Sequence, residues 1–129
     1  MNYECFFNPE LNTVEGVTHG KADVATFLEL MDRVMELCKQ EESANILINH
    51  SDLDAGTLTM ANIETLGRMA ASKKEICKVR KCAHIVANDL QFGLVRAWEI
   101  IVSMYDLTDL EAKLFKNRDE ATEWIKAGK

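Results

Sequence analysis

The sequence predicts an α/β fold in which one mixed β-sheet is flanked by about four helices, in a single domain over residues 1–129. Short apolar runs at residues 46–48 and 83–87 each end in polar, cap-forming residues and pass directly into a helical pattern. Buried strands that feed helices are typical of parallel sheets. A chain of 129 residues has the size of one domain.

The N-terminal segment predicts a β-hairpin followed by a helix. Residues 3–7 are typical of a strand, and the β-permissive residues 13–19 should pair back onto it in antiparallel orientation. From residue 24 to residue 38 the apolar side chains follow helical spacing, with polar residues on the opposite face. This spacing predicts an amphipathic helix.

The middle of the chain predicts a buried strand, a loop and a second helix. Residues 43–49 form the strand, whose apolar centre lacks polar alternation, as expected when both faces are covered. A polar loop over residues 51–56 should lead into a helix over residues 57–74. We expect Met60 and Gly67 on its inner stripe, where a small residue allows close approach to the sheet.

A further strand is predicted at residues 81–87, and Asn88 or Asp89 should cap the long helix that follows it. Phe92 and Trp98 are expected on the inner face of that helix.

The last strand is predicted at residues 110–115, followed by a short helix capped by Asn117. Because strand–helix–strand crossovers are right-handed almost without exception, the last three strands should be parallel. The hairpin then contributes the antiparallel part of a mixed sheet.

Composition and charge exclude several classes of protein. The net charge is −6, and nucleic-acid binding needs a basic face that this chain does not supply. No apolar stretch approaches the roughly 20 residues of a membrane span. The four cysteines include no Cys-x-x-Cys pair, and no export signal is visible, so we expect a cytoplasmic protein with free thiols.

Two segments resemble a known family. Residues 86–96 contain Phe-Gly-x-x-Arg, and residues 114–125 contain Phe-(x)5-Ala-x-x-Trp. Both patterns are similar to those of STAS domains, in the anti-sigma-factor-antagonist-like branch that is grouped with Sec14-type lipid-binding folds. The resemblance implies a mixed sheet flanked by helices and a regulatory or ligand-binding role in place of catalysis.

In the sporulation antagonists of that family, a partner kinase phosphorylates a serine at the start of the helix after the third strand. The motif there resembles Asp-Ser-x-Gly, and this chain departs from it over residues 49–59. Ser51 lies early in the segment, whereas Thr57 and Thr59 lie nearer the helix start. The resemblance therefore implies three candidate phosphorylation sites.

Polar residues gather where two neighbouring strands end. The first group is His50, Ser51, Asp52 and Asp54, and the second is Asn88, Asp89 and Gln91. Strand ends of a parallel sheet meet at one rim, so these residues form a candidate ligand or partner site. They are equally residues that satisfy turns and helix starts through local hydrogen bonds, and this interpretation stays open.

A catalytic use of these residues is the weaker hypothesis. His50 with Asp52 or Asp54 provides a base and a carboxylate for a hydrolase or isomerase, but no nucleophile elbow accompanies them. No ligand spacing predicts a metal, and no motif predicts a cofactor. We therefore predict that the chain is not an enzyme.

Three residues near the second strand end have two interpretations each. His84, inside a buried strand, is expected to be a hydrogen-bonded core residue in preference to a ligand. Gly93 is unfavourable within a helix, so either close packing on the sheet or ligand access to helix amides should explain it. Arg96 either pairs with Glu99 or faces an anionic group or partner.

The sequence thus predicts a cytoplasmic STAS-like regulatory or protein-interaction module, switched by phosphorylation or by a ligand. The alternative is a small-molecule or lipid-binding domain with its pocket at the carboxyl ends of the strands. Carboxylates at the site disfavour a phosphate there, so a neutral or apolar ligand or a protein partner fits better. An edge strand from the hairpin also offers a route to a homodimer.

Overall fold

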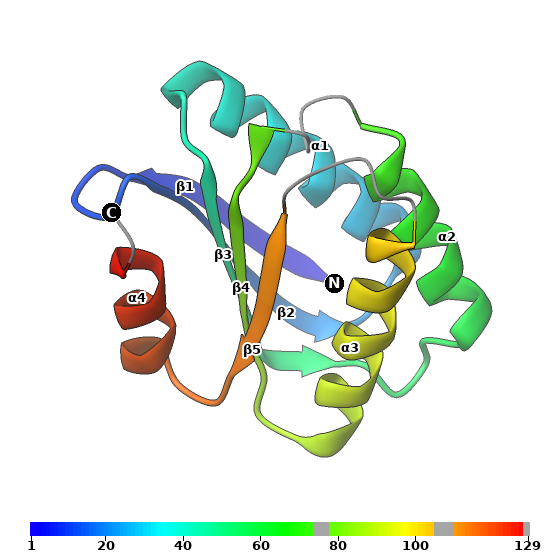
Figure 1. Cartoon of the computed structure of the whole chain (residues 1–129). Coiled ribbons are helices and arrows are strands. Elements are labelled where there is room, and N and C mark those ends of the chain that lie inside the picture. The colour runs from blue at the N-terminus through cyan, green and yellow to red at the C-terminus, as the bar shows by residue number, and fades with distance from the viewer. Residues whose placement is uncertain (74–77, 105–109, 128–129) are drawn as a thin grey trace.

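The computed structural model describes residues 1–73, 78–104 and 110–127, and its elements follow the predicted order. The strands are β1 (Asn2–Asn8), β2 (Thr13–Lys21), β3 (Asn45–Asp54), β4 (Lys81–Ile85) and β5 (Glu111–Phe115). The helices are α1 (Val24–Glu41), α2 (Met60–Ala71), α3 (Asp89–Ser103) and α4 (Arg118–Lys126) (Figure 1). None of the described helices is both long enough and apolar enough to cross a membrane.

The strands form one sheet in the order β1-β2-β3-β4-β5. β1 and β2 pair antiparallel, whereas β2, β3, β4 and β5 pair parallel in succession. The predicted mixed sheet is therefore confirmed, and β2 proves to be parallel to the strands that follow it. The parallel order brings the carboxyl ends of β3, β4 and β5 to the same edge of the sheet.

Helices cover the two faces of the sheet unequally. α1, α2 and α3 lie on one face, and α4 lies on the other (Figure 1). Ile46 and Ile48 belong to the core beneath the three helices, whereas Leu47 between them packs with Ala121 and Ile125 of α4. Both faces of β3 are thus covered, which explains why its centre shows no polar alternation.

Each helix begins at a short polar side chain that accepts a hydrogen bond from the backbone N–H three residues later. These caps are Asp23 for α1, Thr59 for α2, Asn88 for α3 and Asn117 for α4. Such a bond satisfies one of the backbone donors that a helix start leaves unpaired. The predicted caps of α3 and α4 are therefore present.

β3 is longer than predicted, and the expected loop over residues 51–56 is wrong. The strand continues to Asp54 because residues 52–54 still pair with the end of β2. From Val17 to His19 in β2, the paired residue in β3 advances from Asn49 to Asp52. β3 therefore carries one extra residue, which is a β-bulge.

The bulge decides which side chains of β3 face the three helices. Side chains alternate along a regular strand, and an extra residue shifts that alternation by one. His50 and Leu53, three positions apart, accordingly both lie beneath the helices, whereas Asp52 is exposed. The sequence around the bulge therefore has the polar composition of a loop, although it belongs to β3.

Two aromatic or apolar side chains expected to face inward lie outside. Met60 is 57% exposed, at the first residue of α2, and Phe92 of α3 is 48% exposed. Gln91, the neighbour of Phe92, is buried instead. α2 also begins later and ends earlier than predicted.

Gly67 of α2 makes a close approach, but to α3 and not to the sheet as predicted. A Cβ atom at this position would lie 2.5 Å from Cγ2 of Ile101. Gly93 shows the opposite situation, because nothing lies within 4 Å of a Cβ built there, so close packing on the sheet does not explain it. Gly67 thus sets the spacing of α2 and α3, and Gly93 does not.

Candidate functional site

The main candidate site is an apolar cavity of about 140 Å³ between the sheet and helices α1, α2 and α3. Its wall includes Phe27 and Leu30 from α1, Leu66 from α2, and Val95 and Trp98 from α3. A cavity of nearly this size, lined by similar side chains, stays dry and accommodates benzene in another protein. The space therefore suits a small apolar molecule.

A row of polar side chains crosses the sheet wall of this cavity. His50 of β3 and His84 of β4 both line it, and their rings stack with centroids 5.5 Å apart. Nε2 of His50 lies 3.4 Å from Nδ1 of His84. Nδ1 of His50 lies 3.0 Å from the hydroxyl oxygen of Thr18, and Nε2 of His84 lies 3.3 Å from Sγ of Cys82.

We call this row of Thr18, His50, His84 and Cys82 the histidine chain, and hydrogen bonds that run in either direction along it satisfy every member. In one direction, the Thr18 hydroxyl donates to the backbone carbonyl of Asn49, and its oxygen accepts from Nδ1–H of His50. Nε2 of His50 then accepts from Nδ1–H of His84, and Nε2 of His84 accepts from the thiol of Cys82. Each imidazole donates once and accepts once, as a neutral ring must.

Burial keeps the histidine chain uncharged. Desolvation lowers the pKa of His50 to about 4, and desolvation together with the neighbouring His50 lowers the pKa of His84 to about 3. Burial also raises the pKa of Cys82 to about 12, so its thiol is not ionised near neutral pH. The cavity wall is therefore neutral at this row. His84 is buried and hydrogen-bonded, in agreement with its prediction as a core residue.

Gln91 joins α3 to the end of β3. Its side-chain amide donates to the backbone carbonyl of Leu53 at 2.9 Å, and its side-chain oxygen accepts from the backbone N–H of Ala87 at 2.6 Å. Gln91 is buried and lines the cavity. The structure thus brings the end of β3, beside Asp54, together with the start of α3 at Asn88, as the sequence predicted for a shared rim.

The other predicted rim residues do not converge on His50. Asp52 is exposed, and its carboxylate lies 3.7 Å from Nδ1 of His19. Asp54 accepts from the backbone N–H of Gly56 within its own turn. No carboxylate among the described residues contacts His50, so the geometry of a His50–Asp52 or His50–Asp54 catalytic pair is absent.

The three candidate phosphorylation sites occupy different environments. Ser51 is half-buried, and its hydroxyl donates to the side chain of Asn49. Thr57 is exposed and donates to the backbone carbonyl of Ala22, and Thr59 is the exposed cap of α2. Only the two threonines therefore stand near a helix start.

Two further predicted residues lie on the outer side of α3. Asp89 is exposed in its first turn, and Arg96 is exposed and pairs with Glu99 at 3.0 Å. Of the two interpretations of Arg96, the pairing with Glu99 is the one that the structure contains.

A second polar cluster, on the α4 face, was missed by sequence reasoning. The Glu15 side chain in β2 is almost fully buried, and the two terminal nitrogens of the Arg118 guanidinium, Nη1 and Nη2, donate to its carboxylate. Asn8 donates to the same carboxylate at 2.7 Å. Burial alone raises the pKa of Glu15, but these hydrogen bonds and the charge of Arg118 outweigh it and hold the pKa below its usual value. Nothing in the sequence marks a glutamate in an alternating strand pattern as buried.

The histidine chain carried a signal that sequence reasoning left unused. His50 follows the apolar run of β3 and His84 lies within that of β4, and the two strands are neighbours. Side chains of the same face on adjacent parallel strands contact one another. The apolar cavity itself had no such signal, because it depends on the packing of three helices.

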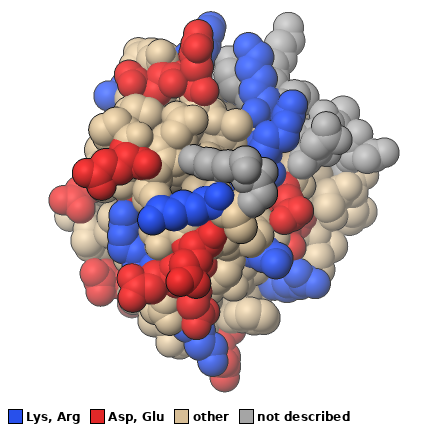
Figure 2. Space-filling view, turned by 60° about the vertical axis from the view of Figure 1, so that its left-hand side comes forward, with Lys and Arg blue, Asp and Glu red and all other residues tan. Residues whose placement is uncertain are grey.

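The surface around α4 and the hairpin carries charges of both signs. Figure 2 shows Lys and Arg side chains lying among Asp and Glu side chains on this face, with uncharged surface between them. In the described part of the chain, no three His, Cys, Asp or Glu side chains are grouped as a metal ion requires.

Comparisons with known proteins agree on the fold. The model of the family described as SpoIIAA-like matches residues 14–126. A crystal structure of an uncharacterised DUF3478-family protein from Shewanella loihica PV-4, described as having a SpoIIAA-like fold, is similar with a TM-score of 0.59. That similarity covers 95% of this chain and 93% of the other at 15% sequence identity. No curated protein matches this chain.

Proposed function

The chain belongs to the SpoIIAA-like family, and we propose that it is a regulatory domain switched by a small apolar ligand in the cavity beneath α1, α2 and α3. Members of this fold family often have regulatory roles and act through protein interactions. Occupancy of the cavity would then control the binding of a protein partner. The resemblance to anti-sigma-factor antagonists, drawn from residues 86–96 and 114–125, agrees with the family match.

The observation that carries this proposal is the cavity itself. Apolar side chains of α1, α2, α3 and the sheet leave a space of about 140 Å³ that a ligand can fill. A ligand that fills the space would add apolar contacts with α1, α2 and α3 and stabilise the folded chain. Ligand binding would thereby be coupled to the packing of these three helices.

The chemistry of the wall supports binding in preference to reaction. The imidazoles of His50 and His84 are neutral and hydrogen-bonded to each other, and the thiol of Cys82 is protonated. A general base or nucleophile must be poised to exchange a proton near the working pH. These groups are held far from that condition.

Thermal unfolding in the presence of toluene and of indole tests the proposal. We expect both to raise the melting temperature of the wild-type chain. Val95→Phe, which places a larger side chain in the cavity wall, should abolish the shift, whereas Val17→Phe in the half-buried part of β2 should retain it. Equal shifts in the wild-type chain and Val95→Phe would place binding elsewhere and contradict the proposal.

A second candidate switch is phosphorylation at the start of α2, favoured by the exposed hydroxyls of Thr57 and Thr59. A phosphate at a helix start is stabilised by the unpaired backbone amides and the helix dipole. The intact mass of the chain isolated from its native cells tests this. Absence of a phosphorylated form under all growth conditions, with Thr57→Ala and Thr59→Ala strains unchanged, would contradict it.

Pairing of two copies through β1 also remains a prediction. β1 is an edge strand, with β2 on one side only among the described strands. An unpaired strand edge is a template for pairing with another chain. Molar mass measured by light scattering tests this prediction.

A further inference from the structure

Resting on the proposed function of the cavity, we infer that its ligand is an apolar monocarboxylate whose body fills the cavity and whose carboxylate binds the ammonium group of Lys73. The inference concerns the chemical class of the ligand and the end of the cavity at which its charged group lies. Four features of the wall carry it.

The first feature is the size of the space. At about 140 Å³ the cavity matches one that accommodates benzene, so a molecule the size of a substituted benzene or a short alkyl chain fits. Larger apolar ligands with two long chains are too bulky for this volume.

The second feature is the histidine chain, which offers no anchor to a charged group. Its members satisfy one another, and Gln91, the other uncharged polar side chain of the described wall, is hydrogen-bonded at both ends to backbone groups. Placing an unpaired carboxylate against this neutral row costs its full hydration. The part of the ligand that lies here must therefore be apolar.

The third feature is Lys73, the one ionic side chain among the described residues that line the cavity. Its side chain is only 26% exposed, so its aliphatic stem lies along the wall while the ammonium group reaches the surface. Lys73 follows the C-terminal end of α2, where its backbone N–H donates to the carbonyl of Ala70. A ligand whose apolar body lies in the cavity can therefore place an anionic end on this ammonium group.

The fourth feature is Asp32 of α1, whose carboxylate shows that the ammonium group of Lys73 can form an ion pair with a carboxylate. The two side chains form an ion pair, and the side chain of Asp32 is 63% exposed. An exposed ion pair of this kind contributes little stability. A ligand carboxylate can therefore replace that of Asp32, which returns to water.

Together these features favour an anionic ligand over the alternatives. No carboxylate lines the described wall, and Asp32, which pairs with Lys73, is 63% exposed, so a cationic ligand finds no buried partner of opposite charge. A neutral apolar ligand fits the cavity but forms no ion pair with the ammonium group of Lys73.

Two pairs of probes test the inference by calorimetric titration. Hexanoate is compared with 1-hexanol, and phenylacetate with toluene, so that each pair differs chiefly in its charged group. We expect the carboxylate of at least one pair to bind the wild-type chain about fivefold more tightly than its neutral partner, as a partly exposed ion pair allows. The better pair identifies an alkyl or an aryl body.

Three variants locate the charged group. Lys73→Met keeps the aliphatic stem and should remove the preference for the carboxylate without changing the affinity of the neutral probe. Asp32→Asn removes the competing carboxylate and should strengthen carboxylate binding. Lys39→Met, which removes an exposed charge from the outer side of α1, is the matched control and should leave the preference intact.

The outcomes separate this inference from the proposed function. Equal affinities for charged and neutral probes, or an unchanged preference in Lys73→Met, would overturn the inference while cavity binding stands. Failure of all four probes to bind would overturn both. If Lys39→Met also loses the preference for the carboxylate probe, that preference comes from the general charge of the surface, and the inference is overturned.

Discussion

At the scale of single residues, the most informative pair is His50 and His84. Each lies in a different strand, and each is fully desolvated beneath the helices. Their burial is stable only because the Thr18 hydroxyl and the Cys82 thiol complete their hydrogen bonds. The folded protein thus holds two histidines in the neutral form.

This neutrality predicts an acid-dependent loss of stability. The pKa of His50 lies at about 4 and that of His84 at about 3 in the folded chain, below the value of 6.5 expected when unfolded. Between about pH 6.5 and pH 4 the unfolded chain therefore binds more protons, so the free energy of unfolding falls as the pH falls. Each histidine contributes at most about 1.4 kcal/mol per pH unit in that window.

Denaturant unfolding between pH 6 and pH 4.5 measures this slope. His84→Gln should make the slope shallower by about one proton, or about 1.4 kcal/mol per pH unit. The matched control His19→Gln changes a half-exposed histidine outside the cavity wall, and we expect the slope to persist. A slope unaffected by His84→Gln would mean that His84 is not held neutral.

The sequence allowed His84 to be predicted but misplaced His50. His84 lies inside an apolar run, and such runs indicate burial directly. His50 lies among Asn49, Ser51 and Asp52, a composition typical of loops. The pairing of these residues with the end of β2 kept them in the strand, and that tertiary contact is not visible in local sequence.

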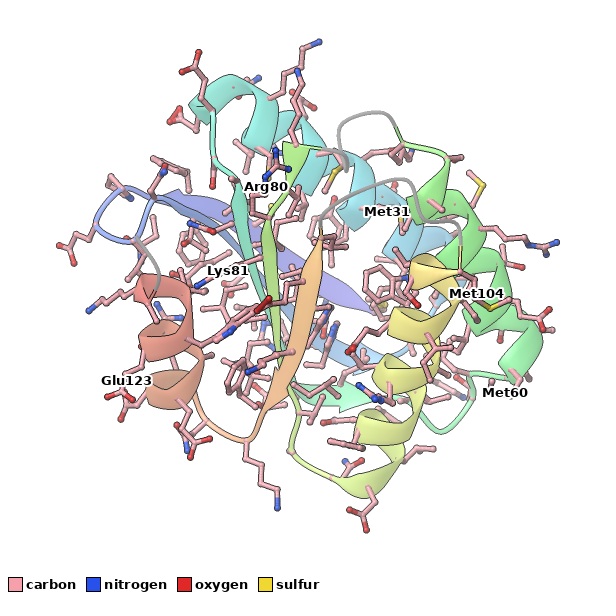
Figure 3. All side chains as sticks on the ribbon, in the orientation of Figure 1. Met31, Met60, Arg80, Lys81, Met104 and Glu123 are labelled. Carbon is pink, nitrogen blue, oxygen red and sulfur yellow. The ribbon has the colours of Figure 1, made fainter. Side chains whose placement is uncertain are left out.

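At the scale of elements, the contact between α2 and α3 determines one wall of the cavity. Gly67 allows Ile101 to approach α2, and Trp98 and Val95 of α3 then face the sheet. Met60, the first residue of α2, and Met104, the residue that follows α3, are both exposed (Figure 3). Helical spacing predicted that α2 and α3 are amphipathic, but not which helix faces which neighbour.

The two helical glycines give opposite predictions. Gly67→Ala should lower the free energy of unfolding by about 1–3 kcal/mol, because its methyl group meets Ile101. Gly93→Ala should raise it by about 0.5–1 kcal/mol, because the new methyl group meets nothing and the helix is favoured. Chemical denaturation measures both changes. A lower free energy of unfolding in Gly93→Ala would contradict the prediction, because no atom within 4 Å of the new methyl group accounts for it.

The attachment of α4 gives a third prediction. Arg118 at its first turn pairs with the buried Glu15 of β2, and Lys81 of β4 donates to the backbone carbonyl of Trp124 at 2.7 Å. Arg118→Ala removes two of the hydrogen-bond donors to the buried Glu15 carboxylate and should lower the free energy of unfolding by about 2–3 kcal/mol. Arg33→Ala, at an exposed pair with Glu36, is the control and should change it by less than about 0.5 kcal/mol. Equal effects of the two changes would show that the Glu15–Arg118 pair is not specially stabilising.

At the scale of the whole molecule, one sheet separates two different surroundings. The face under α1, α2 and α3 contains the cavity and the histidine chain, whereas the α4 face contains the Glu15–Arg118 pair. The mixed sheet, the parallel order and the four helices followed from periodicity and chain connection. The sequence offered a pocket at the carboxyl ends of the strands as one alternative, but the position, lining and volume of this cavity depend on how three helices meet the sheet and not on any one segment.

The cavity also changes how the predicted rim is understood. Gln91 lines the cavity and joins the start of α3 to the end of β3 through hydrogen bonds to backbone groups. Asp54 and Asn88 serve the local turn and the helix start. The structure contains the local hydrogen bonds that one interpretation of the rim expected, and a ligand or partner at the rim stays a prediction.

The most direct test of the account is a crystal structure of the wild-type chain under xenon pressure. Xenon enters apolar space of this size without requiring any hydrogen bond. We predict anomalous density in the space bounded by His84, Trp98 and Leu66, and none there in Val95→Phe. A wild-type structure in which side chains fill that space and no xenon binds would contradict the account.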